Sequence, residues 1–324
     1  MFPALLLATA LLALPPGVDP TLFPDVDKLP AGEIELAGLA SLYPGRILHE
    51  APQSLDEHDK GRAPMHYDSL PRNLDYLRVY DLGVALPQIT KLLNDKPALI
   101  LDLRFLRTDA NDAAGLAGVL SQAGLEHAAI HSEGEAIFEP GKLPAHDPKD
   151  TRPAPVVLVL VNGLTSGPVE AWLAAFQEKD GVLLVGTPTA GQPAHYKAME
   201  GHPGYYIIDG ELLPASGSLV GLGVKPRFQV DVTPEQSYDA YYFVERGGDI
   251  KTLLQHDATT TTASAPAKPA TAASAPIPQS VPVEEISDPV LQRAVDVVAA
   301  LQVLNRLPSS TAPAAPARST TAQR

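Results

Sequence analysis

The chain of 324 residues is long enough for one large or two modest domains, and its hydrophobic content of 45% is ordinary for a globular protein. A net charge of −14 argues against a nucleic-acid partner, because the phosphates would be repelled. The chain has no cysteine, which excludes a disulfide framework, a thiolate zinc site and a cysteine nucleophile.

The first 73 residues carry few signs of regular structure. Residues 2–14 form an apolar run that is too short to span a bilayer and is typical of a secretory signal peptide, although no Lys or Arg precedes it. We therefore expect a signal peptide over residues 1–16, export to the periplasm or cell surface, and no transmembrane helix in the mature chain. Residues 17–73 are rich in Pro, Gly, Asp and His and predict an irregular region, in which Glu33–Leu42 fits a strand or a short helix.

Patterns of buried strands and packed helices follow. Leu74–Val79 and Ala98–Leu103 are predicted as strands, and Val84–Leu93 as a helix between them. A helix of small residues is predicted over Asp112–Gly124. Residues 125–152 are punctuated by Pro and Gly, so we expect an irregular insertion there.

Residues 155–192 read as strand, tight loop, helix and strand. Val156–Val161 is an unbroken apolar run, which favours a strand buried on both faces of a sheet. Val169–Gln177 repeats apolar residues at spacings of three and four, as one face of a helix does, and Val182–Val185 predicts the next buried strand. The small-residue loop before the helix would direct N–H groups of the helix N-terminus outward, a common place for a nucleophile or an oxyanion.

The C-terminal third is predicted to change from strands to a linker and a last helix. Residues 205–213 predict a hairpin, and Phe228–Val232 a strand. The Thr/Ala/Ser/Pro tract over 257–282 predicts a flexible linker. An amphipathic helix is expected within 283–307, docked on the core or, alternatively, on a partner, and residues 308–324 should be disordered.

Several stretches, in the same order, resemble the family of C-terminal processing (tail-specific) serine peptidases. The resemblance covers roughly residues 74–245 and the last helix. It implies an α/β fold of the Clp protease/crotonase type, with buried strands and flanking helices, and a core domain over 74–256. The matching residues are Tyr76 and Arg78, Leu101 to Arg104, Val161, Asn162, Glu170, Val185, Gly186, Pro188, Thr189, Gly191 and Gly223 to Pro226.

The resemblance also implies where the chemistry would lie. The family's serine nucleophile precedes the Glu by three residues, and its lysine base follows the last Gly; here these positions hold Gly167 and Gln192. A hydrogen atom and a neutral amide cannot act as nucleophile and base, so no catalytic residues are expected. The residues expected to line the remaining cleft are Arg104, Phe105, Thr165, Ser166, Gly167 and Glu170.

A further family motif is altered after the strand at 98–103. The family continues with Asn-x-Gly-Gly, whose glycine amide helps to hold the oxyanion, whereas this chain has Phe105-Leu106-Arg107-Thr108. Bulky side chains in place of the glycines should crowd the site. Asp102 and Arg104, just before this motif, also fit a structural pair at the strand end.

Three functional hypotheses stay open. In the first, the protein is non-catalytic and its former cleft binds a peptide or protein C-terminus, or serves as a scaffold. In the second, it is an active serine peptidase that uses Ser166 as a displaced nucleophile and Lys197 as base, although Thr165 and Ser166 also fit a helix-capping role.

The third hypothesis is a metal-dependent hydrolase built from the His- and Glu-rich loops. The spacing of the first three histidines matches no ligand pattern, and no predicted strand or helix fixes the side chains of the 125–152 segment together, so a metal is not expected. No cofactor is expected either. The histidines concerned are His49, His58, His66, His127, His131 and His146.

Overall fold

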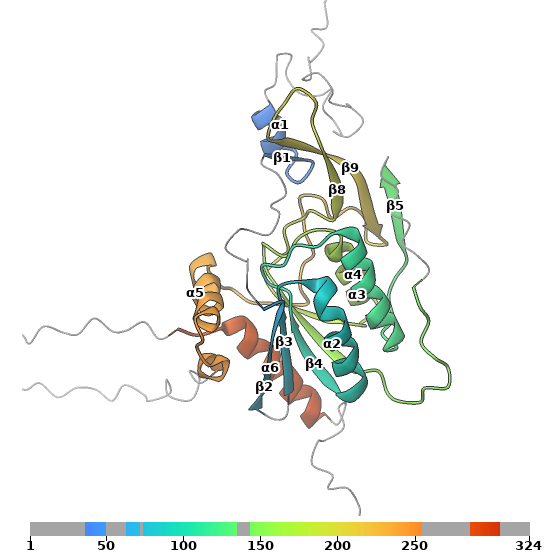
Figure 1. Cartoon of the computed structure of the whole chain (residues 1–324), viewed down its shortest axis with the longest axis vertical. Helices are drawn as coiled ribbons and strands as arrows, with labels where there is room; N and C mark the ends of the chain where they lie inside the picture. The colour runs from blue at the N-terminus through green and yellow to red at the C-terminus, as the bar shows by residue number, and fades with distance from the viewer. Residues whose placement is uncertain (1–35, 50–62, 72–73, 135–142, 255–285, 305–324) are drawn as a thin grey trace, which may run out of the picture.

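The structure is a computed structural model that describes residues 36–49, 63–71, 74–134, 143–254 and 286–304 (Figure 1). The signal peptide, the linker and the C-terminal tail that the sequence predicts lie outside the described residues.

A six-stranded sheet forms the centre of the fold, in the order β10-β7-β6-β4-β3-β2. β2 pairs antiparallel with β3, and the other neighbours are parallel, so the carboxyl ends of five strands share one edge. The strands are β2 (Met65–Leu70), β3 (Leu74–Val79), β4 (Ala98–Asp102), β6 (Val156–Val161), β7 (Leu183–Gly186) and β10 (Phe228–Gln229).

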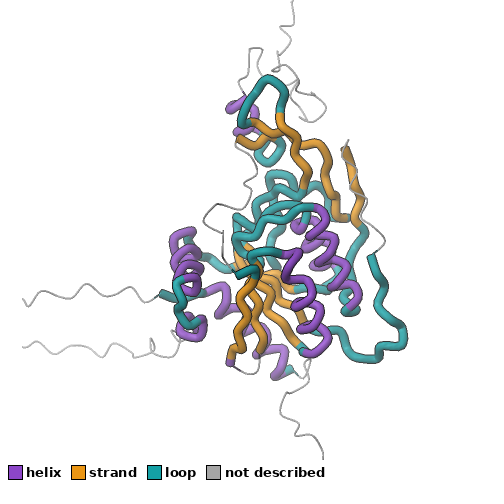
Figure 2. The backbone as a smooth tube through the Cα atoms, in the orientation of Figure 1, coloured by secondary structure: helices purple, strands orange, loops and turns teal. Residues whose placement is uncertain are grey.

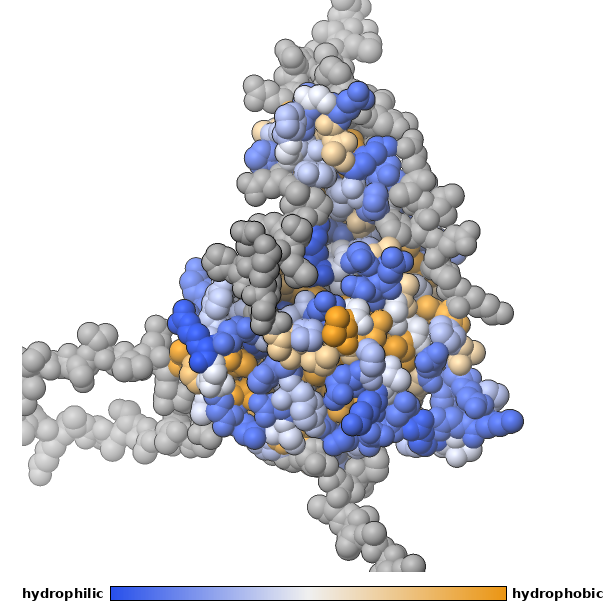
Figure 3. Space-filling model, viewed as in Figure 1, coloured by the Kyte–Doolittle hydropathy of each residue, from blue (hydrophilic) through white to orange (hydrophobic). Residues whose placement is uncertain are grey.

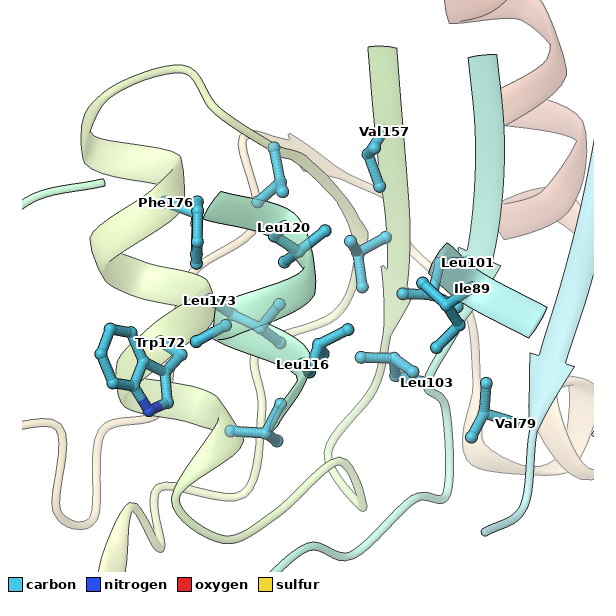
Figure 4. Close-up of a cluster of buried hydrophobic side chains, with 14 of the residues drawn as sticks. Val79, Ile89, Leu101, Leu103, Leu116, Leu120, Val157, Trp172, Leu173 and Phe176 are labelled. Atoms are coloured by element: carbon cyan, nitrogen blue, oxygen red, sulfur yellow. The ribbon is translucent and has the colours of Figure 1, made fainter. Parts of the chain in front are cut away.

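The unbroken apolar run of β6 is explained by burial on both sides of the sheet. Val157, Val159 and Val161 pack into one hydrophobic cluster. Leu158 and Leu160, which point to the opposite face, pack into a second. Figure 4 shows the first cluster, in which side chains of the sheet interlock with those of the helices above it.

Helices cover both faces of this sheet, giving three layers (Figure 2). α2 (Leu82–Asp95), α3 (Ala110–Gln122) and α4 (Val169–Glu178) pack on one face. The opposite face is covered by α5 (Pro234–Glu245), the 3₁₀ helix η5 (Ile250–Leu254) and α6 (Pro289–Val303). The α/β class predicted from the sequence is confirmed, and α6 docks on the core.

Side chains fix where these helices begin. Asp81 accepts the N–H of Val84 at 3.1 Å before α2, and Asp109 accepts the N–H of Asp112 at 2.9 Å before α3. Such caps satisfy N–H groups that have no partner inside the helix. α5 starts with a capping box in which the residues before and within its first turn bond reciprocally.

A smaller sheet lies beyond the carboxyl edge of the main sheet, at the upper end of the molecule in Figure 1. Its long strand β9 (Tyr205–Pro214) pairs antiparallel with β1 (Ile47–His49), β5 (Ile130–Gly134) and β8 (Ala194–Ala198). α1 (Leu36–Leu42) packs against it through Leu36 and Leu39.

The hairpin predicted over 205–213 is wrong, because β9 runs straight through Asp209 and Gly210. Gly210 instead lies opposite Gly134, where the backbones of β5 and β9 approach closely. A Cβ on Gly134, its partner in β5, would lie 2.7 Å from the Cα of Gly210 and 2.6 Å from the Asp209 carbonyl oxygen. β5 also places a regular strand inside the 125–152 insertion that was expected to be irregular.

The region before residue 74 contains more helices and strands than the sequence predicted. Of the alternatives for Glu33–Leu42, the structure shows the helix α1, and β1 and β2 also lie in this region. β2 joins the main sheet through six pairs with β3. Its half-exposed side chains do not give the continuous apolar pattern of the inner strands.

On the face shown in Figure 3, hydrophilic and hydrophobic residues gather over different elements. Figure 3 shows hydrophilic residues gathered over the 143–155 loop and hydrophobic ones near α2, where Val84 is 53% exposed. Within the described ranges, none of the helices combines the length and apolar character that crossing a membrane requires.

Candidate functional site

Three loops meet at the carboxyl edge of the main sheet, one after each of β4, β6 and β7. Asn162, directly after β6, accepts the N–H of Phe105 on its side-chain oxygen at 3.1 Å. Thr165 donates its hydroxyl to the carbonyl of Leu103 at 2.9 Å, and its own carbonyl accepts the N–H of Ala190 at 3.0 Å. The buried Thr165 therefore links all three loops, at the edge where open α/β sheets bind ligands.

Glu170, in the first turn of α4, holds the loop after β7 in place. Its carboxylate accepts the backbone N–H groups of Gly191 and Gln192, both at 2.7 Å, and the hydroxyl of Thr189. Burial raises the pKa of Glu170, and these hydrogen bonds oppose that rise. The structure places this predicted cleft residue beneath the loop, fully buried, where it sets the position of Gln192.

Gly167 occupies a place that admits no side chain. Its φ is 95°, in the left-handed region that favours glycine. A Cβ built on it would lie 2.2 Å from the carbonyl oxygen of Thr108 and 3.0 Å from the Thr108 hydroxyl. Both the backbone conformation and the space around it therefore exclude a serine at this position unless the loop moves.

The segment that crowds Gly167 pairs with the loop after β6 like a short parallel strand. Arg107 bridges to Ser166; the N–H of Ser166 donates to Leu106 at 2.9 Å, and the N–H of Thr108 to Ser166 at 3.1 Å. The Thr108 hydroxyl also accepts the N–H of Val169, the first residue of α4, at 3.2 Å. One N–H group at the N-terminus of α4 is thus already hydrogen-bonded within the protein.

The helix-capping role expected of Thr165 and Ser166 is wrong. Pro168, the residue before α4, makes no side-chain capping bond, and the capping hydroxyl comes from Thr108. Sequence reasoning missed this residue because it lies 61 positions before its partner, where no local capping pattern can mark it.

The residues predicted as an alternative nucleophile and base, Ser166 and Lys197, lie on different elements of the fold. Ser166, 7% exposed, lies in the loop after β6 at the edge of the main sheet, next to Thr165, whose carbonyl accepts the N–H of Ala190. Lys197 lies on β8 in the smaller sheet, where its ammonium is 2.8 Å from a carboxylate oxygen of Asp209 on β9. His195 Nδ1 is 3.5 Å from the other oxygen of the same carboxylate.

Arg104 belongs to a buried ionic network, and the structural pair it was expected to form with Asp102 is confirmed. It donates to Asp102 at 2.7 and 3.0 Å, and to Asp288, the N-cap of α6, at 2.7 and 2.9 Å. Burial would raise the pKa of Asp102, but Arg104 and Arg78 outweigh it and hold that pKa well below its usual range. The Tyr76 hydroxyl also donates to Asp102 at 2.6 Å. The network fastens α6 to the strand that ends at the site.

Phe105 is the predicted cleft residue with the most unusual backbone. Its φ is 64°, which costs a non-glycine residue about 1–2 kcal/mol. Its ring lies 4.5 Å from that of Tyr241 and 5.2 Å from that of Tyr238, centroid to centroid. Tyr238 is 40% exposed, so the aromatic contacts that help to hold Phe105 extend to the surface.

Three of the histidines considered for a metal site have other partners in the structure. His66 pairs with Asp68 at 3.3 Å, whereas His127 and His146 bond to backbone carbonyls. His58 lies outside the described residues. Within the described ranges, no group of three His, Cys, Asp or Glu side chains is placed to hold a metal ion.

No protein family and no curated protein matches the chain by sequence. Among solved structures, the chain is similar to a photosystem II D1 C-terminal processing protease, with 18% identity, a TM-score of 0.38, and coverage of 52% of this chain and 48% of the other. It is similar to a lipoprotein from Streptococcus agalactiae, with 14% identity, a TM-score of 0.43, and coverage of 64% and 79%.

A third similar structure is mature CPAF complexed with lactacystin, with 11% identity, a TM-score of 0.36, and coverage of 51% and 49%. The chain spans about half the length of the D1 processing protease and of CPAF.

Proposed function

We propose that this protein is a non-catalytic relative of the tail-specific serine peptidases and that its former cleft binds a peptide or protein segment. The observation that carries the proposal is the position of Gly167, where the nucleophile would be. A side chain there would collide with the backbone carbonyl of Thr108, 2.2 Å from the Cβ position. Because that obstacle is backbone, trimming a side chain would not remove it.

The neighbouring groups support the same proposal. The N–H of Val169, a natural donor to an oxyanion, is bonded to the Thr108 hydroxyl. Gln192 has no proton-accepting pKa, and Lys197 is engaged with Asp209. Acyl transfer needs a nucleophile and a base held within hydrogen-bond reach of each other, and these residues supply neither role.

A binding role is supported by the surroundings of β10. This two-residue strand forms one edge of the main sheet among the described residues, and an extended peptide can add to such an edge through its backbone. A hollow of about 360 Å³ adjoins it, lined by Pro188 and Gln236 among others. Export, expected from the apolar run over residues 2–14, is part of the proposal.

The proposal is tested by treating the full chain with a fluorophosphonate probe and locating any adduct by mass spectrometry. The matched control is Ser166→Ala. We expect no adduct in either protein, and no cleavage of a denatured, unfolded substrate protein. Labelling at Ser166 that the substitution removes would refute the non-catalytic assignment and favour the displaced-nucleophile hypothesis.

A further inference from the structure

We propose that Arg107 is a carboxylate-binding residue and anchors an acidic group of the segment bound in the former cleft. The inference rests on the proposed binding function and adds the chemistry that the cleft recognises. Arg107 stands where the related peptidases have a glycine, so the side chain is an addition to the site rather than a remnant of its catalysis.

The backbone of Arg107 is fixed at the carboxyl edge of the main sheet. Its bridge to Ser166 is held by hydrogen bonds on both sides, from Ser166 to Leu106 and from Thr108 to Ser166. The side chain therefore projects from a well-supported strand-like segment beside Gly167. Groups positioned by such a segment are held more precisely than groups on a free loop.

The guanidinium of Arg107 is half-buried, yet it has no hydrogen bond or ion pair within the described part of the chain. Burial lowers its pKa, and only the phenol of Tyr196 acts in the opposite direction. Withdrawing a guanidinium from water without an acceptor is costly. A charged ligand that supplies the acceptor would recover that cost.

The carboxylates that the structure describes in this part of the fold already accept hydrogen bonds from other groups. Glu170 accepts the N–H groups of Gly191 and Gln192, Asp109 caps α3, and Glu211 accepts the hydroxyl of Ser218. Each of these groups has a structural partner of its own. Since none of these described carboxylates pairs with Arg107, we assign its acceptor to the bound ligand.

A carboxylate is the ligand group that fits best, because the planar guanidinium can donate two parallel hydrogen bonds to its oxygens. The loop after β6, which pairs with the Arg107 segment, also carries an exposed apolar side chain. Leu164, 49% exposed, and Phe105 both donate their N–H groups to the Asn162 side chain at 3.1 Å, which places them side by side. A segment held by its carboxylate at Arg107 would lay an apolar side chain on the exposed Leu164.

Two peptide sources offer this carboxylate: a C-terminus and an acidic side chain. Pools of random nonapeptides distinguish them. One pool has free C-terminal acids, the second is the same pool amidated, and the third is amidated and lacks Asp and Glu. Each is incubated with the full chain, and bound peptides are quantified by mass spectrometry for the wild type, Arg107→Gln, Arg107→Lys and Arg152→Gln.

Arg152 is the matched control, because its exposed guanidinium pairs with Asp150 and Asn94 at the opposite edge of the sheet. Thermal unfolding of each variant verifies that it is folded. We expect Arg107→Gln to lower capture of the carboxylate-bearing peptides about 10- to 100-fold, as for loss of one charged hydrogen-bonded pair. Arg107→Lys should retain part of the capture, and Arg152→Gln all of it.

Comparison of the three peptide pools shows which carboxylate, if either, is bound. Preference for the free acids over both amidated pools assigns the C-terminus, and preference of the second pool over the third assigns an acidic side chain. Equal capture of all three pools, unchanged in Arg107→Gln, would overturn the inference and leave peptide binding intact. Capture of none of them would overturn the proposed binding function as well.

Discussion

Replacing Gly167 with serine would supply the hydroxyl that a serine peptidase needs, and we expect this substitution to destabilise the fold. The new Cβ would lie 2.2 Å from the Thr108 carbonyl oxygen, whereas ordinary contacts of a Cβ lie at 3.4–4 Å. The residue would also have to adopt a φ of 95°. Either the serine is strained or the loop that carries Thr108 is displaced.

The cost has two parts. A left-handed conformation costs a non-glycine residue about 1–2 kcal/mol, and overpacking a well-filled site adds about 1–3 kcal/mol. Gly167→Ser should therefore lower the free energy of unfolding by about 2–5 kcal/mol. Since each kcal/mol shifts Tm by about 2–4 °C for a folded unit of this size class, the expected fall in Tm is about 4–20 °C.

Gly201→Ser is the matched control, because Gly201 also has a positive φ, 77°, but no atom within 4 Å of the Cβ position. It should cost only the conformational part, about 1–2 kcal/mol. The assay is urea unfolding of both variants, followed by peptidase assays of Gly167→Ser combined with Gln192→Lys. Equal stability of the two serine variants, or peptide cleavage by the double variant, would refute the reasoning.

Three further predictions follow from the buried charges. Glu170→Gln should lower the free energy of unfolding by about 2–4 kcal/mol and speed hydrogen exchange at the Gly191 amide, because that amide loses a charged acceptor. Unchanged exchange would contradict the role given to Glu170. Asp288→Ala should lower the free energy of unfolding by about 3–5 kcal/mol, because the buried guanidinium of Arg104 loses one of its two carboxylate partners. The control Asp296→Ala, at an exposed position, should have little effect on urea unfolding. Because the pKa of Asp102 is held below its usual range, its stabilisation is present above about pH 4 and is lost as the pH falls. Asp102→Asn should therefore flatten the pH dependence of stability below about pH 4 by up to roughly 1.4 kcal/mol per pH unit, and an unchanged slope would count against the network.

The strands of the main sheet were largely predictable because their signal is local. The run over Val156–Val161 is apolar at every position since alternate residues meet different helix layers, and its predicted bounds match β6. Leu74–Val79 likewise matches β3. β5 and β2 were not predicted, because edge strands with exposed side chains lack that continuous pattern.

The Asp209-Gly210 pair shows a different kind of error. A Gly after Asp fits a turn, but the same glycine also lets two backbones approach, and only the position of Gly134 in the neighbouring strand distinguishes the two. Similarly, the sequence alone showed that Glu170 matches a position of the peptidase motif. Its role in holding the Gly191 and Gln192 amides became apparent only when the loop after β7 was placed beside α4.

Two properties could be read along the amino-acid sequence: the alternation of buried strands and helices, and the presence of Gly167 and Gln192 where the peptidase family that the motifs resemble has a nucleophile and a base. Hydrophobic periodicity and residue identity are local properties, so they can be read along the chain. The position of Thr108 over Gly167 and its hydrogen bond to the first turn of α4 became visible only in the folded molecule. These contacts join residues about sixty positions apart, and their geometry depends on how parallel strands bring separate loops to one edge.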